Sequence, residues 1–205
     1  MKQIARILSV LFHPLLLITL GTYFILEFDR IYHLALDTRT LLTYLLIILM
    51  GTFVFPVNTI FLLQKLLRKD ISVYMQKKED RRLPLLVAAI FVLLTFYMFS
   101  YKLGYRAPHL IRGYLLGTSS SIILASIVNV RYKISLHGIG LGGVLGVLFF
   151  LQESAYTDLR WIIAGWFVIS GIVLWARLYL ESHSPNQIYA GFMAGFFIIY
   201  LIIRL

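Results

Sequence analysis

The feature that most constrains this sequence is a series of long apolar stretches separated by short polar segments. The stretches lie at about residues 7–26, 41–64, 84–101, 110–130, 138–152, 161–180 and 188–203. A helix needs about 20 apolar residues to cross the bilayer core, where the backbone must satisfy its own hydrogen bonds. The sequence therefore predicts an all-α, polytopic membrane helix bundle. Because two of the stretches are short, six and seven transmembrane helices both remain compatible with the pattern.

Composition narrows the class of protein further. Hydrophobic residues make up 60% of the chain and charged residues 14%, which excludes an ordinary soluble enzyme. A linker rich in Ser, Gly or Pro is missing from the sequence, so we expect residues 1–205 to form a single membrane domain. The absence of cysteine excludes disulfides and zinc-cysteine sites. The net charge of +10 indicates anionic partners, and in a membrane protein these are lipids rather than nucleic acid.

Three local patterns predict details of the helices. The first apolar stretch is followed by no small-x-small cleavage site, so we expect a retained helix rather than a signal peptide. Pro56 predicts a kink in the second helix, whose freed carbonyl a neighbouring group must satisfy. Glycines recur every four residues on two of the predicted helices, which indicates close helix packing. They are Gly138, Gly142 and Gly146 on one helix and Gly191 and Gly195 on the other.

Polar residues gather in the connections after the second, fourth and sixth stretches. If all seven stretches cross the membrane, these connections emerge on one face and can converge there. The first is typical of an interfacial amphipathic segment, with Lys65, Arg68, Lys69, Asp70, Lys77, Lys78, Glu79, Asp80, Arg81 and Arg82. The other two contain Arg131, Lys133, Ser135 and His137, and then Arg177, Glu181, Ser182, His183, Ser184 and Gln187.

These residue types favour phosphoryl chemistry. Histidine can act as a nucleophile or as a general acid near neutral pH, and arginine and lysine can neutralise the charge of a transferring phosphoryl group. Polar groups at membrane depth usually mark a functional site. Hydrolysis with Ser135 as nucleophile is less favoured, because the sequence places no obvious carboxylate to orient a histidine in a Ser-His-Asp triad.

The order of these connections resembles the three motifs of the type 2 phosphatidic acid phosphatase superfamily of membrane lipid phosphatases. The third family motif is Ser-Arg, five residues, His, three residues, Asp, and the chain has Ala176-Arg177, His183 and Gln187 at this spacing. The second motif, Pro-Ser-Gly-His, corresponds to residues 134–137, Ile-Ser-Leu-His. The first motif, Lys, six residues, Arg-Pro, is suggested by residues 77–84. The resemblance covers a core from about residue 75 to 195.

The resemblance implies a two-step hydrolysis that needs no metal ion or other cofactor. His183 would attack phosphorus to form a phosphohistidine, His137 would protonate the leaving oxygen, and water would then release phosphate. The substrate-binding residues implied in this way are Lys78, Arg81, Arg82, Ser135 and Arg177.

Gln187 stands where the family has the carboxylate that orients the nucleophile. An amide can fix the ring tautomer by hydrogen bonding, but it stabilises an imidazolium less than a carboxylate does. Residues 184–187 also form a capping-box sequence with proline at the first helical position, so orientation of His183 and helix capping are both open roles. A glutamine at this place is similar to the dolichyl-diphosphatase-type branch, which directs the expected substrate toward polyprenyl phosphates or diphosphates.

We therefore expect a membrane lipid phosphatase in a bacterial-type inner (plasma) membrane. Its expected partners are membrane lipids and a lipid phosphate or diphosphate substrate of the polyprenyl diphosphate, phosphatidic acid or phosphatidylglycerol phosphate type. The alternative is a noncatalytic lipid-phosphate transporter or binding protein that retains the fold. Gln187 favours this alternative, as does Leu136 in place of the glycine of the second motif. The oligomeric state is left open.

Overall fold

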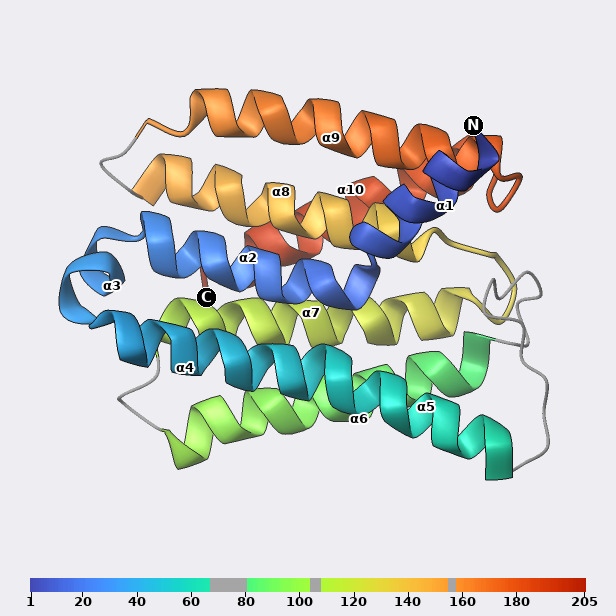
Figure 1. The fold of residues 1–205 in the computed structure, drawn as a ribbon. Helices are drawn as coiled ribbons and strands as arrows, with labels where there is room; N and C mark the ends of the chain where they lie inside the picture. Colours follow the sequence, from blue (N-terminus) through green and yellow to red (C-terminus); the bar gives the residue numbers. More distant parts are fainter. Residues whose placement is uncertain (67–80, 104–107, 155–157) are drawn as a thin grey trace.

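The computed structural model describes residues 1–66, 81–103, 108–154 and 158–205, and helices account for the regular structure throughout these ranges. Figure 1 shows the long helices running alongside one another as a bundle. The α-helices are α1 (Lys2–Leu11), α2 (Pro14–Phe28), α3 (Arg30–Ala35), α4 (Thr38–Leu49), α5 (Phe55–Leu66), α6 (Arg82–Tyr97), α7 (His109–Val128), α8 (Leu136–Ser154), α9 (Arg160–Tyr179) and α10 (Pro185–Ile202).

The predicted fold class is confirmed. Six helical segments of the described residues are long and apolar enough to cross a membrane: Thr38–Leu66, Arg82–Lys102, α7, α8, α9 and α10. A seventh span results if α1 and α2 together form one bent crossing. The chain is thus an all-α, multi-pass membrane helix bundle.

The first apolar stretch is not the single helix that the sequence predicts. It is divided into α1 and α2, which meet at an angle of 52°. Pro14 has no N–H to continue the helix, and the N–H of His13 turns back to the carbonyl of Val10 at 3.2 Å. The His13 Nδ1 atom then accepts the N–H of Leu15 at 3.3 Å, and so caps the start of α2. Apolar residues on both sides of His13 and Pro14 conceal this break in the sequence.

A π-helical segment, Met50–Val54, lies just before Pro56, between α4 and α5. At its end the N–H of Phe55 bonds the carbonyl of Met50, five residues back. The Asn58 side chain donates to the Val54 carbonyl at 2.8 Å. The helix therefore continues through the π-helical segment, and Thr38–Leu66 is one continuous span. The kink expected at Pro56 itself stays a prediction.

Close packing of α8 against α10 confirms the prediction from the glycine spacing, and it is the most extensive helix contact in the described residues. A Cβ atom added at Gly195 would lie 2.0 Å from the carbonyl oxygen of Ile139. One added at Gly142 would lie 2.0 Å from that of Phe192. Because these distances are far below van der Waals contact, only glycine allows the two backbones to approach so closely.

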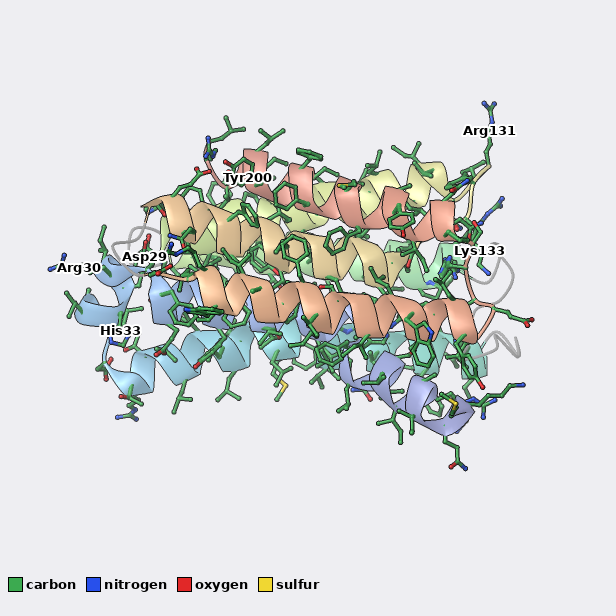
Figure 2. All side chains as sticks on the ribbon, turned by 90° about the horizontal axis from the view of Figure 1, so that it is seen from above. Asp29, Arg30, His33, Arg131, Lys133 and Tyr200 are labelled. Carbon is green, nitrogen blue, oxygen red and sulfur yellow. The ribbon has the colours of Figure 1, made fainter. Side chains whose placement is uncertain are left out.

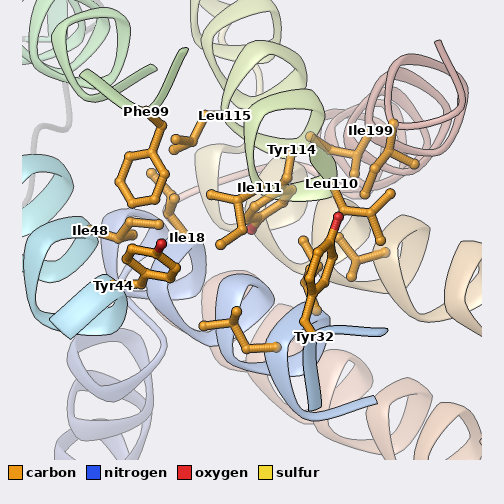
Figure 3. Packing of buried hydrophobic residues seen from close by; sticks show 14 of the residues in the cluster. Ile18, Tyr32, Tyr44, Ile48, Phe99, Leu110, Ile111, Tyr114, Leu115 and Ile199 are labelled. Atoms are coloured by element: carbon orange, nitrogen blue, oxygen red, sulfur yellow. The ribbon is translucent and has the colours of Figure 1, made fainter. Parts of the chain in front are cut away.

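The remaining helices pack on this pair through a core of large apolar side chains, shown in Figure 3. Tyr44 and Phe99 meet edge to face with ring centroids 5.7 Å apart, linking α4 to the segment that continues α6. Tyr114 of α7 donates its hydroxyl to the carbonyl of Leu17 at 3.2 Å. The Tyr114 bond attaches α7 to α2.

We expect Gly195→Ala to destabilise the protein by about 1–3 kcal/mol, because the added methyl group overpacks the contact between α8 and α10. Gly171→Ala is the matched control, since a Cβ at Gly171 meets nothing within 4 Å. That change should be neutral or stabilising by up to about 1 kcal/mol through helix propensity. Thermal unfolding in detergent measures the stability of both variants. Equal melting temperatures would contradict the close contact of α8 and α10 at Gly195.

Candidate functional site

The residues of the three predicted motifs lie at one end of the bundle. Here α6, α8 and α10 begin and α9 ends, with α1 beside them, at the right of Figure 1. Figure 2 shows Arg131 and Lys133 at this end, and Asp29, Arg30 and His33 at the opposite one. We call this the motif end and define it by Arg81, residues 134–137, Arg177, His183 and Gln187.

His183 occupies the centre of the motif end, in the connection between α9 and α10. Its Nδ1 atom lies 3.0 Å from Gln187 Oε1, and its Nε2 atom lies 3.3 Å from Arg81 Nη2. A guanidinium can only donate, so Nε2 accepts and the ring proton is on Nδ1, from which it is donated to Gln187. The imidazole is therefore neutral, with the lone pair of Nε2 directed at a cation.

Burial and charge both keep His183 unprotonated. The side chain is only 7% exposed, and its burial lowers the pKa to about 3, with the positive charge of Arg81 acting in the same direction. The hydrogen bond to Gln187 opposes this shift but does not cancel it. A neutral imidazole with a directed Nε2 lone pair is the form that can act as a nucleophile.

Gln187 makes the contacts that both of the roles left open by the sequence would use. Its Oε1 atom accepts from the His183 ring and also from the backbone N–H of Ser184, at 3.3 Å, as a capping box requires. The connection bends sharply because Glu181 has a positive φ of 52°. The N–H of Ser182 then bonds the carbonyl of Arg177 at 3.1 Å, which closes the end of α9.

Two buried arginines flank the imidazole. Arg81 is 4% exposed, and its Nη1 atom donates to the Ile134 carbonyl at 3.1 Å. Burial lowers the pKa of Arg81 to about 10, with a contribution from the charge of Arg177. Arg177, 8% exposed, donates from Nη1 to Ser9 Oγ at 3.2 Å, while its buried Nε has no hydrogen-bond partner among the described residues. A buried donor of this kind is costly unless a ligand satisfies it.

A third cation, Lys133, lies in the connection that leads to α8. Burial lowers its pKa first, and the positive charges of Arg81 and Arg177 lower it further. Arg81, Arg177 and Lys133 thus place three positive charges near His183. Across the described ranges there is no group of three or more His, Asp or Glu side chains that could hold a metal ion.

His137 is at the motif end but turned toward α1. Its Nε2 atom lies 2.9 Å from the carbonyl oxygen of Ser9, and because a carbonyl only accepts, this nitrogen carries the proton. Its ring also packs edge to face on that of His13, with centroids 6.4 Å apart. Within the described residues no hydrogen bond joins it to His183, so a role as proton donor would have to use the other ring nitrogen, Nδ1.

The other predicted ligands differ in their placement. Ser135 is fully buried and its Oγ accepts the N–H of Gly138 at 3.1 Å, so it caps α8. Arg82 is exposed, and the described residues offer it no hydrogen bond or ion pair at the site. Arg81, rather than Arg82, is thus the arginine that meets His183. Lys78 lies outside the described residues.

Ser9 is a site residue that the motif spacing does not indicate. It contacts both Arg177 and His137.

No protein-family model, no curated protein and no solved structure matches the chain. A function must therefore be argued from the chemistry of the site residues.

We expect the His183 ring to stay neutral between pH 5 and 8, because its pKa of about 3 lies well below the ordinary value of 6.5. Arg81→Gln removes a positive charge that disfavours the imidazolium, so the pKa of His183 should rise toward its ordinary value. Histidine ring NMR in detergent micelles, assigned with His183→Ala, measures both. A wild-type His183 that titrates near pH 6.5 would contradict the burial of its ring beside Arg81.

Proposed function

We propose that the chain is a membrane lipid phosphatase that hydrolyses a lipid phosphate or diphosphate through a phosphohistidine intermediate. The observation that carries this proposal is the neutral His183 imidazole, held by Gln187 at Nδ1 and directed at Arg81 from Nε2. The spare Nε donor of buried Arg177 supports it. Together these groups offer a nucleophile and a cationic cradle for one phosphoryl group.

The proposed first step begins with an incoming phosphate that takes Arg81 Nη2 away from the imidazole. Nε2 of His183 attacks phosphorus, an N–P bond forms, and the bond from phosphorus to the leaving oxygen breaks. As the anionic phosphate enters, His137 takes up a proton at Nδ1 and passes it to the leaving oxygen. Proton loss from Nδ1 of His183 is not required, because the Gln187 carbonyl holds that proton throughout.

The second step restores the enzyme. Water loses a proton to His137 and attacks the phosphorus of the phosphohistidine, and the N–P bond breaks as inorganic phosphate forms. Arg81 and Arg177 neutralise the phosphoryl oxygens in both steps, which is the main electrostatic contribution in phosphoryl transfer. These steps need neither metal ion nor cofactor.

The proposed substrate is a membrane lipid whose phosphate reaches the motif end while its tail stays in the bilayer. Polyprenyl phosphates and diphosphates are the favoured class, with phosphatidic acid and phosphatidylglycerol phosphate as the others. The proposed location is a bacterial-type inner (plasma) membrane.

The alternative function is a noncatalytic lipid-phosphate transporter or binding protein. It is favoured by the neutral amide of Gln187, which stabilises the positive charge developing on His183 less than a carboxylate would. Under this alternative the cations bind phosphate, and His183 contributes to the binding site without forming a bond to phosphorus.

We expect His183→Ala to abolish release of inorganic phosphate by the purified protein, because it removes the nucleophile. The assay contains EDTA and a panel of undecaprenyl diphosphate, undecaprenyl phosphate, phosphatidic acid and phosphatidylglycerol phosphate. His33→Ala, which changes an exposed histidine at the opposite end, should retain wild-type turnover. Labelled substrate should also leave an acid-labile phosphoryl group on the wild type and on His33→Ala, but none on His183→Ala. Equal turnover by a folded His183→Ala variant would exclude the mechanism, and binding without release would favour the alternative.

We expect Gln187→Ala to lower turnover by about 100-fold, because the ring of the nucleophile loses its orientation. Gln187→Glu keeps an acceptor for both Nδ1–H and the Ser184 N–H, and should remain active. Gln152→Ala is the control, since the Gln152 amide also accepts a backbone N–H, that of Leu159 at 2.7 Å, away from the site. If Gln187→Ala loses stability but keeps its turnover per folded molecule, Gln187 only caps α10.

A further inference from the structure

Ser9 of α1 contacts residues of both the second and the third motif, although α1 belongs to none of the three motifs. Its Oγ atom lies 3.2 Å from Arg177 Nη1, and its carbonyl oxygen lies 2.9 Å from His137 Nε2. Ser9 is 8% exposed, so water competes little for these bonds. One residue thus contacts both the arginine and the second histidine of the site.

The hydroxyl of Ser9 has one arrangement that satisfies its neighbours. Its proton is donated to the carbonyl of Ala5 at 2.9 Å, one turn earlier in α1. Its oxygen then has a lone pair for the guanidinium of Arg177, which can only donate. The bond fixes Nη1 and leaves Nε of Arg177 as the buried donor without a partner among the described residues.

The carbonyl of Ser9 is available because α1 ends where it does. In a continuous helix it would accept the N–H of His13, four residues later. Here the N–H of His13 bonds the Val10 carbonyl instead, at the break imposed by Pro14. The freed carbonyl accepts from His137 Nε2, which places the ring proton there and leaves Nδ1 as the atom that can exchange a proton.

We propose that Ser9 is a positioning residue for phosphate binding and proton transfer, acting through Arg177 and His137. The proposal rests on the proposed lipid phosphatase function and extends it to α1. The Ser9 hydroxyl orients the Arg177 guanidinium so that its remaining donors face the phosphoryl oxygens. The Ser9 carbonyl holds His137 in the tautomer with a proton on Nε2, so that Nδ1 can carry the proton for the leaving oxygen.

Buried serines elsewhere in the bundle have simpler surroundings. Ser119 of α7 is 1% exposed and donates its hydroxyl to the Leu115 carbonyl at 2.8 Å, the same bond that Ser9 makes to Ala5. No arginine contacts the Ser119 hydroxyl within the described residues. Ser119 is therefore a matched control for the loss of a buried helical hydroxyl.

The test compares Ser9→Ala, Ser9→Thr and Ser119→Ala in the full-length protein in detergent. Ser9→Ala should raise KM for the lipid substrate and the inhibition constant of inorganic phosphate by about tenfold, because Arg177 loses its orienting acceptor. Its kcat should fall by less than about threefold, since the backbone carbonyl that holds His137 remains. Ser9→Thr keeps the hydroxyl and should restore KM, and Ser119→Ala should match the wild type.

Ser9→Cys keeps the shape of the side chain but accepts hydrogen bonds weakly, so it replaces Ser9→Ala if that variant does not fold. An unchanged KM in a folded Ser9→Ala or Ser9→Cys variant would overturn the proposal. So would a Ser9→Thr variant as impaired as Ser9→Ala, since the hydroxyl would then be irrelevant.

Calorimetric titration with inorganic phosphate separates this proposal from the proposed function. A wild type that binds phosphate but releases none from any lipid, with tenfold weaker binding by Ser9→Ala, would exclude the phosphatase and keep the Ser9 contact to the anion site. An active wild type with a normal Ser9→Ala variant would exclude only the role of Ser9. A wild type that neither binds nor releases phosphate would overturn both.

Discussion

The backbone contact between α8 and α10 is the constraint on which the motif end depends. Gly191 faces the Ser135 carbonyl so closely that an added Cβ would lie 2.5 Å from it. At the same level the N–H of Ser135 donates to the carbonyl of Gln187 at 3.2 Å, which holds the starts of the two helices side by side. His137 lies in the first turn of α8 and His183 just before α10, so these main-chain contacts help to place both residues. Larger residues along this seam would separate the two histidines as well as the helices.

Much of the fold follows from local sequence, because the membrane imposes a length and an apolar surface on each crossing. The glycine spacing also predicts close packing of two helices, since residues four apart share one helix face. The sequence does not reveal the break between α1 and α2, because long apolar runs lie on both sides of His13 and Pro14. Pro14 was the available signal, but proline is equally common in the first turn of a helix, which is where it lies in α2.

The site was less predictable, and distance along the chain explains why. His183 and Gln187 are four residues apart, and the resemblance to the third family motif suggests their pairing. Ser9 lies 128 residues from His137 and 168 from Arg177, and only packing of α1 on α9 brings them together. Adjacent Arg81 and Arg82 are equivalent in sequence, yet the start of α6 directs one inward and leaves the other exposed. Such choices depend on helix orientation, which no local pattern specifies.

The amide at position 187 fits the charge of its surroundings. Arg81, Arg177 and Lys133 place positive charge around His183, and each lowers the tendency of the ring to protonate. A carboxylate at this position would hold the ring in the same tautomer, but it would offset part of the positive charge before an anion arrived. The Gln187 amide orients the ring without that loss, at the expense of weaker support for the imidazolium. Under the proposed function, Gln187 thus favours binding of the anionic phosphate over stabilisation of charge on the histidine.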